Sequence, residues 1–142
     1  MALYDPTNIF AKILRGEIPC HEVFENADAL AFMDIMPRCD GHTLVIPKAP
    51  ACDLLDIAPA SLAALIQTVQ KVAGGVRAGM QAEGLTLQQF SGSASGQVVF
   101  HIHFHILPRC SGVSLRPHTS EMEKPEILAA NAAKIRAALA SI

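Results

Sequence analysis

The sequence predicts a mixed α+β domain in which a mainly antiparallel sheet of about five strands packs against helices. Short segments rich in β-branched and aromatic residues stand on both sides of one long helical pattern, and an alanine-rich segment ends the chain. Strands that are grouped in this way, instead of alternating with helices, favour antiparallel pairing. With 142 residues, of which 51% are hydrophobic, the chain can bury a core as one domain.

The first half of the chain contains a short helix followed by three strands. Thr7 or Asn8 can cap a helix that runs to Leu14, because a side-chain oxygen placed before an apolar stripe accepts the first N–H groups. Turn-forming residues then separate three apolar segments, which we expect to be strands. These segments are 21–26, 29–34 and 42–47.

The second half begins with the long helix. Pro59 suits the first turn of a helix, and apolar residues recur at helical spacing from there to the region of Gly74 and Gly79. An extended segment, a Ser/Gly-rich loop, a second extended segment and a terminal helix follow, at 85–90, 91–97, 98–107 and 124–142. We find no internal repeat and no domain boundary, so residues 1–142 are expected to form a single domain.

The charge and composition of the chain exclude several classes of partner. The formal net charge is −2 and the basic residues are not clustered, so nothing indicates binding to nucleic acid or to an anionic membrane surface. The N-terminal residues lack the apolar core of a signal peptide, and no apolar stretch has the length of a membrane span. The four cysteines show no paired spacing, and without an export signal we expect them to be reduced thiols. We therefore expect a cytoplasmic protein.

Three histidines at alternating positions are the strongest functional signal. His101, His103 and His105 lie in the apolar segment 98–107, and alternate residues of a strand share one face of a sheet. The intervening apolar residues should face the opposite way; they are Phe100, Ile102, Phe104 and Ile106. Burying three imidazoles without partners costs free energy, because each ring has two nitrogens that form hydrogen bonds. The pattern therefore indicates chemistry at this strand.

Two kinds of chemistry fit this pattern. The first is a metal site, because two neighbouring imidazoles on one face suit zinc, copper or iron. Such a site needs a further ligand, and His21, His42 and His118 stand in no recognisable ligand spacing. The second is nucleophilic catalysis at phosphorus, because a neutral imidazole can form a covalent intermediate near pH 7. The Ser/Gly loop 91–97 directly precedes the histidines and offers backbone N–H groups for phosphoryl oxygens, which favours the second interpretation.

The segment His101–Leu107 resembles the signature of the histidine triad (HIT) family, in which three histidines alternate with apolar residues. Further segments are similar to family blocks and occur in the family's order; they are 9–19, 31–37, 41–48 and 96–97. The similarity runs from about residue 8 to residue 109 and is greatest to the Hint-like bacterial branch. Residues 110–142 form a C-terminal tail that contains the terminal helix.

This resemblance implies a HIT-like fold and a nucleotide-binding hydrolase. Members of the family cleave at the α-phosphate of purine nucleoside phosphoramidates or dinucleoside polyphosphates through a nucleotidyl-histidine intermediate. The expectation is therefore a homodimeric AMP phosphoramidase-type enzyme whose partner is a purine nucleotide. A nucleotidylyltransferase of the same superfamily, or a nucleotide-binding signalling module with incidental catalysis, are the alternatives.

The resemblance also implies a role for each matching residue. His103 would be the nucleophile, and His105 would bind oxygens of the α-phosphate. His101 and His42 would orient His103 and manage protons. Gln97 and the loop before it would close over the phosphate.

The remaining family positions would hold the nucleoside. Asp34 matches a carboxylate that accepts hydrogen bonds from the ribose hydroxyls. Five apolar residues match the pocket for the base: Ile9, Phe10, Ile13, Phe32 and Ile35. Gly96 and Ser91 belong to the loop at the nucleotide, where Ser91 stands at a position that is commonly asparagine.

The chain also departs from relatives that carry a structural zinc ion. Asn8 and Ala11 stand where those relatives have cysteines, and Pro50 replaces a histidine, which argues against structural zinc. The imidazole chemistry requires no cofactor, although magnesium can accompany a polyphosphate substrate. His118, in the tail, is expected to be solvated.

Overall fold

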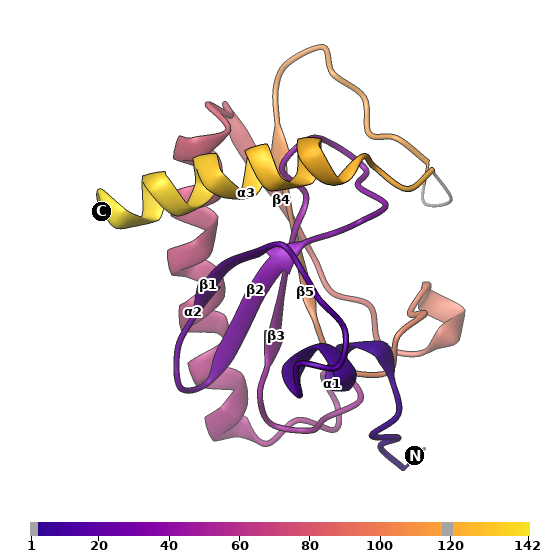
Figure 1. Cartoon of the computed structure of the whole chain (residues 1–142). Coiled ribbons are helices and arrows are strands. Elements are labelled where there is room, and N and C mark those ends of the chain that lie inside the picture. Colours follow the sequence, from indigo (N-terminus) through magenta and orange to yellow (C-terminus); the bar gives the residue numbers. More distant parts are fainter. Residues whose placement is uncertain (1–2, 118–120) are drawn as a thin grey trace.

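The computed structural model describes residues 3–117 and 121–142 (Figure 1). His118 lies outside the described residues. The elements follow the predicted order: α1 (Ile9–Leu14), β1 (Glu22–Glu25), β2 (Ala29–Met33), β3 (Thr43–Pro47), α2 (Pro59–Gly79), β4 (Gly84–Gln88), a 3₁₀ turn (Ser93–Ser95), β5 (Phe104–Arg109) and α3 (Pro125–Ala140). The predicted α+β class with one long helix is confirmed. None of the described helices is both long and apolar enough to cross a membrane.

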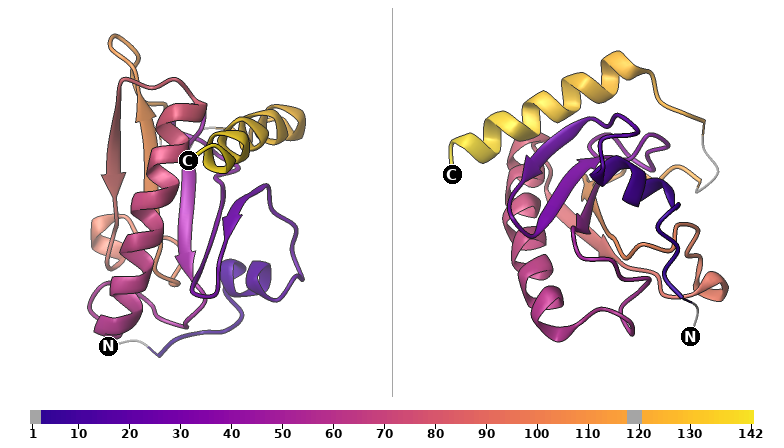
Figure 2. Two further views of the ribbon diagram at one scale, coloured as in Figure 1. Left: turned by 90° about the vertical axis from the view of Figure 1, so that its left-hand side faces the viewer. Right: turned by 60° about the horizontal axis from the view of Figure 1, so that its bottom comes forward.

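The five strands form one sheet in the order β1-β2-β3-β5-β4, and every neighbouring pair is antiparallel. Helices α2 and α3 cover one face of the sheet, and α1 lies against the other face (Figure 2). Because β5 lies between β3 and β4, residues that are far apart in the sequence meet near the start of β5. His105 is opposite Leu44 on β3 and Gln88 on β4.

The two faces of the sheet carry two separate hydrophobic clusters. On the side of α2 and α3, Val45 and Ile106 pack against helix residues such as Val69. On the side of α1, Leu44 and Ile46 pack with phenylalanines from α1 and β2. Side chains alternate between the faces along each strand, so even a single register step would exchange the two clusters. The histidine face is the α1 face, because His105 is paired with Leu44.

Helix α1 begins where the sequence predicts. The Asn8 side chain accepts a hydrogen bond from the Ala11 backbone N–H at 2.9 Å, which satisfies one N–H group of the first turn. Of the two candidate caps, Asn8 is therefore the one used. The cap fixes the entry of the chain into a helix whose Phe10 is buried against the sheet.

The strand that carries the histidines is shorter than the sequence pattern predicts. We expected one strand over 98–107, but β5 begins at Phe104, so His101 and His103 lie ahead of the ladder. The pairing of β3 with β5 ends at Val45 and Phe104, although β3 itself continues to Pro47. Pro47 has no backbone N–H and could not donate to a longer ladder. The prediction of a continuous strand was therefore wrong over its first half.

The predicted alternation of side chains also ends in this segment. Ile102, Phe104 and Ile106 are buried on the α2 side, as expected. Phe100 was expected to join them, but it is 38% exposed. The chain bends at residues 99–101, where no neighbouring strand holds it extended, so the two-residue period does not reach Phe100.

Helices α2 and α3 cross at close range, and small residues make this possible. A Cβ atom on Gly79 would lie 2.8 Å from the backbone oxygen of Lys134 on α3. A Cβ atom on Gly74 would meet only Ile142, at 3.9 Å. The α2–α3 contact therefore depends on Gly79 but leaves room at Gly74.

We expect Gly79→Ala to lower the free energy of unfolding by about 1–3 kcal/mol, because a helix backbone must move to accept the methyl group. Gly74→Ala is the matched control, and it should raise stability by about 0.5–1 kcal/mol through helix propensity alone. Urea denaturation followed by circular dichroism measures both values. Equal effects of the two substitutions would contradict the close crossing.

Candidate active site

His103 is buried beside the start of β5, with 8% of its surface exposed. Its Nδ1 lies 2.7 Å from the backbone oxygen of His101. A carbonyl oxygen can only accept, so Nδ1 carries the proton and Nε2 carries the lone pair. Burial lowers the pKa of His103, which keeps the ring neutral near pH 7. His103 therefore presents a neutral imidazole whose Nε2 can act as a nucleophile.

His42 and His105 form a directed pair next to His103. The backbone N–H of Arg38 donates to His42 Nδ1 at 3.0 Å, so a neutral His42 carries its proton on Nε2. This Nε2–H donates to His105 Nδ1 at 2.9 Å, which leaves the His105 proton on its own Nε2. The ring centroids of His103 and His105 are 5.0 Å apart. An electron-pair donor on His103 and a hydrogen-bond donor on His105 thus occupy neighbouring rings.

His101 occupies a different position from the other two histidines of the pattern. Its ring is 1% exposed, its Nε2–H donates to the Pro47 carbonyl at 2.8 Å, and its Nδ1 accepts from the Tyr4 hydroxyl at 2.6 Å. Both ring nitrogens are therefore engaged within the protein. His101 touches His103 through its backbone carbonyl, which orients the His103 ring.

Tyr4 is a site residue that sequence reasoning missed. It stands 97 positions from His101, and no motif connects the two residues. The tyrosine ring meets the His101 ring edge-on, with centroids 5.6 Å apart. The contact exists because the chain ahead of α1 returns to the histidine face of the sheet.

Asp34 lies at the end of β2, beside His42. One carboxylate oxygen accepts from the Met36 N–H at 2.9 Å, and the other lies 3.5 Å from His42 Nε2. Burial raises the pKa of Asp34 to about 6. The structure thus brings Asp34 together with His42 and His105, as expected for one site.

The Gln97 side chain holds the Ser/Gly loop through hydrogen bonds to backbone groups. The Gln97 amide donates to the carbonyls of Cys52 and Val99 at 2.7 and 3.0 Å, and its oxygen accepts from the Gly92 N–H at 2.8 Å. Both N–H groups of the side chain are engaged in these bonds. Gln97 therefore shapes the loop that precedes the histidines.

Gly96 and Ser91 complete the loop in different ways. Gly96 has a φ of 112°, a conformation that only glycine adopts without strain. The Ser91 hydroxyl accepts from the Leu54 N–H at 3.2 Å and hydrogen-bonds to Gln89. Ser91 thereby ties the loop to the segment that follows β3.

The five apolar residues expected around the base divide into two groups. Phe10 and Phe32 are buried and meet edge-on at 5.5 Å, and Phe10 also meets the His103 ring at 4.9 Å. Ile13 packs against this pair as a half-buried residue. Ile9 and Ile35 are 42% and 41% exposed, so a ligand could cover them.

Phe90 is a further site residue that the sequence pattern did not indicate. Its ring meets the His105 ring at a centroid distance of 5.5 Å and an interplanar angle of 72°. It follows β4, the strand next to β5, so sheet topology alone brings it to His105.

Within residues 3–117 and 121–142, three potential metal ligands come together. Atoms of Asp34, His42 and His105 lie within 4.8 Å of one another. Two imidazoles and a carboxylate suit zinc. His101 and His103 do not take part, so the structure does not assemble the two-histidine ligand pair that alternation suggested.

Comparison with known proteins identifies the family of this chain. The family model for the HIT domain matches residues 15–112, and the chain belongs to this family. An uncharacterized HIT-like protein of Azospirillum brasilense is 44% identical over 107 residues, which cover 72% of this chain and 86% of the relative. The adenosine 5'-monophosphoramidase hnt1 of Schizosaccharomyces pombe is 40% identical over 101 residues, 71% of this chain and 73% of that protein. The adenylylsulfatase HINT3 of Arabidopsis thaliana is 34% identical over 122 residues, 82% of this chain and 62% of that protein.

A solved structure extends the similarity over nearly the whole chain. A HIT-like protein from Bartonella henselae, described as involved in cell-cycle regulation, superposes with a TM-score of 0.90 at 50% identity. The superposition covers 96% of this chain and 99% of the other. The HIT-like fold expected from the sequence is therefore confirmed.

The raised pKa of Asp34 predicts how stability changes with pH. Because the folded value of about 6 exceeds the ordinary value of 3.8, the folded state binds this proton more tightly than the unfolded state. The resulting stability is fully present below about pH 4 and is lost as the pH rises through about 6. Asp34→Asn cannot ionise and should lack this loss.

Relative to the natural chain, the unfolding free energy of Asp34→Asn should rise by about 2 kcal/mol between about pH 4 and pH 7.5. Urea denaturation at closely spaced pH values measures this difference. A difference that stays constant across the range would show that Asp34 titrates normally in the fold.

Proposed function

We propose that the protein is a nucleotide hydrolase that cleaves at the α-phosphate of purine nucleoside phosphoramidates or dinucleoside polyphosphates. HIT membership and the hydrolases among its relatives support hydrolase activity on nucleotides. The observation that carries the finer proposal is the His103 ring, whose Nδ1–H is bound to the His101 carbonyl. This bond directs the basic Nε2 away from the backbone, as a nucleophile at phosphorus requires.

The proposed reaction has two displacements at one phosphorus atom. His103 Nε2 forms a bond to the α-phosphorus while the bond from phosphorus to the leaving amine or phosphate breaks, and a leaving amine takes a proton from water. The hydroxide left by that proton transfer then attacks the same phosphorus, or, where phosphate was the leaving group, water attacks and gives its proton to the solvent. The P–N bond to His103 breaks, and the mononucleotide is released. The covalent intermediate divides one difficult displacement into two easier ones.

His105 and His42 supply the electrostatic support for both steps. The Nε2–H of His105 would donate to a non-bridging oxygen of the α-phosphate, where negative charge increases in the transition state. His42 keeps this proton on Nε2, because its own Nε2–H occupies His105 Nδ1. The donor is therefore oriented before the substrate binds, which is the arrangement that lowers a reaction barrier most.

The nucleotide part of the substrate is suggested by the named relatives. One is an adenosine 5'-monophosphoramidase and another an adenylylsulfatase, so both names refer to adenylyl compounds. We propose AMP conjugates as the first substrates, with Asp34 at the ribose and the exposed Ile9 and Ile35 beside the base.

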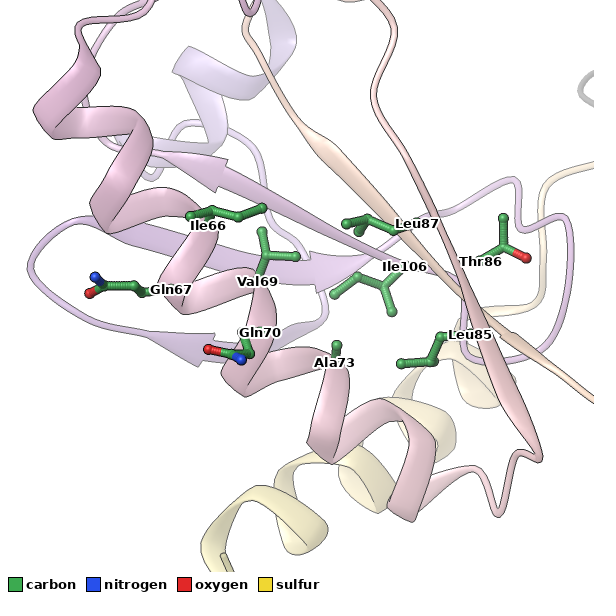
Figure 3. Close-up of a pocket in the computed structure, with 9 residues that line it drawn as sticks. All are labelled: Ile66, Gln67, Val69, Gln70, Ala73, Leu85, Thr86, Leu87 and Ile106. Carbon is green, nitrogen blue, oxygen red and sulfur yellow. The ribbon is translucent and has the colours of Figure 1, made fainter.

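We further propose that two copies of the chain pair along β4. This strand is at the edge of the sheet, and its Leu85 and Leu87 are 38% and 49% exposed. Together with α2 residues such as Ile66, they line an apolar cavity of about 410 Å³ (Figure 3). Leu87 is opposite Ile106, whose side chain is on the α2 side, so the cavity lies on the face opposite the histidines. An open edge with apolar side chains favours antiparallel pairing with an identical edge across a two-fold axis.

The nucleophile is tested by His103→Ala. Hydrolysis of an adenosine 5'-phosphoramidate should fall by more than about a thousandfold, because the variant lacks the imidazole that would form the covalent intermediate. AMP should still bind, as measured by calorimetry, because the ribose and base contacts remain. The matched control is His21→Ala, a histidine outside the site, which should keep full activity.

Turnover by His103→Ala close to that of the natural chain would refute the assignment of the nucleophile. Transfer of the nucleotide to an acceptor other than water would indicate a nucleotidylyltransferase instead. Binding of AMP without any turnover by the natural chain would favour a nucleotide-binding module.

The pairing of β4 is tested by Leu87→Asp. A charge in the centre of the apolar edge should convert the dimer to a monomer, because two carboxylates would be buried together in the interface. Light scattering after size-exclusion chromatography measures the mass. Leu55→Asp, at a leucine that is 81% exposed outside the sheet, is the control and should leave the mass unchanged. A natural chain that is already monomeric would refute the pairing.

A further inference from the structure

The loop between β2 and β3, residues 35–41, links the nucleoside side of the site to its catalytic side. Its backbone N–H at Arg38 donates to His42 Nδ1 at 3.0 Å and thereby sets the tautomer of His42. The backbone N–H of His42 in turn donates to the Cys39 carbonyl at 3.1 Å. Any shift of this loop therefore reaches His42, and through it the proton of His105.

The segment that follows β5 is hydrogen-bonded to this loop through Arg116. The backbone N–H of Arg116 donates to the Arg38 carbonyl at 2.7 Å, and the side-chain Nε–H of Arg38 donates to the Arg116 carbonyl at 2.9 Å. Two residues 78 positions apart thus exchange a reciprocal pair of hydrogen bonds. Nothing in the family-like blocks of the sequence includes Arg116.

The side chain of Arg116 adds contacts on the outer side of the loop. Its guanidinium donates to an Asp40 carboxylate oxygen at 2.7 Å and lies 3.5 Å from the Pro37 carbonyl. It also lies 3.9 Å from the carboxylate of Glu123, whose own N–H donates to the Ile35 carbonyl at 2.8 Å. The chain on either side of residues 118–120 is therefore attached to the loop.

We infer that Arg116 is a positioning residue, which holds Arg38 so that the His42–His105 pair keeps one tautomer. The Arg116 guanidinium holds the loop at Asp40 and at the Pro37 carbonyl, and the Arg116 backbone N–H holds the Arg38 carbonyl. From there the contacts continue from the Arg38 backbone N–H to His42 and from His42 to His105. Its consequence for catalysis rests on the proposed function, but its effect on the histidine rings does not.

The exposure of the ion pair indicates where the effect should appear. The Arg116 and Asp40 side chains are 40% and 59% exposed, and exposed ion pairs contribute little to global stability. Several contacts made by one side chain can nevertheless restrict the local opening of a loop. Loss of the Arg116 side chain should therefore change the local opening of the loop and the histidine tautomers more than the global free energy of unfolding.

The test compares Arg116→Ala with the natural chain by nitrogen-15 NMR and amide hydrogen exchange. In the variant, the Arg38 amide should exchange about tenfold faster, and the ring nitrogens of His42 should shift from a single tautomer towards a mixture. The kcat/KM for an adenosine phosphoramidate should fall about tenfold, since small displacements of reacting groups have large effects on rate. Arg116→Lys keeps the charge opposite Asp40 and should recover part of each effect.

Two further variants make the result decisive. Arg77→Ala removes an exposed arginine at the end of α2 and should leave all three measurements unchanged. Asp40→Asn removes the negative charge opposite Arg116 but keeps an acceptor oxygen, and it should reproduce the effects in the same direction at a smaller size. It also serves if Arg116→Ala does not fold.

An unchanged Arg38 exchange rate together with unchanged His42 ring signals would overturn the inference. Altered ring signals in Arg116→Ala, combined with no hydrolysis even by the natural chain, would support the positioning role and refute the proposed function.

Discussion

The hydrogen bond from His103 Nδ1 to the His101 carbonyl is the contact on which the site depends. It requires that this carbonyl is not used by the sheet, and therefore that the ladder stops before it. Pro47 ends the neighbouring strand, and its own carbonyl accepts from the His101 ring. Ile102 is held by one bond to the Ala51 carbonyl at 2.9 Å. Breaking the strand early thus frees the backbone to orient the ring that would carry the chemistry.

The three histidines of the pattern differ because their partners differ. The His101 ring lies between Tyr4 and a backbone carbonyl, so it acts as a structural element. The His103 ring is oriented by a carbonyl and keeps a basic nitrogen. The His105 ring accepts from His42 at Nδ1 and carries its proton on Nε2. Identical side chains therefore acquire distinct roles from the donor or acceptor beside one nitrogen.

The two faces of the sheet carry different groups: the larger apolar core lies on one face and the histidines lie on the other. The face under α2 and α3 buries the larger apolar cluster, and helices pack there at backbone distance. The face under α1 holds the histidines, with only a smaller cluster around Phe10 and Phe32. Loops attached to rigid strands supply the remaining groups, as in many binding sites. The loop at residues 35–41 is one of them, and a segment distant in sequence holds it.

The sequence by itself determined the order of the elements, the antiparallel class and the family. These follow from local signals, such as the Asn8 cap, Pro59 at the first turn of α2 and the alternation of apolar residues, each of which acts within a few residues. The family blocks added the expectation that Asp34 and His42 join the histidines, because a resemblance carries spatial information that composition lacks.

Only the tertiary structure decided where β5 begins, which nitrogen of each ring holds a proton, and that Tyr4 contacts His101 and Arg116 contacts Arg38. Each of these depends on a hydrogen-bond partner that is distant in the chain, such as Tyr4 for His101 or Arg116 for Arg38. Periodicity reports which face a side chain occupies, but it contains no information about which donor or acceptor meets a given atom. The protonation pattern of the site is therefore a property of the folded chain, since folding alone brings those atoms within bonding distance.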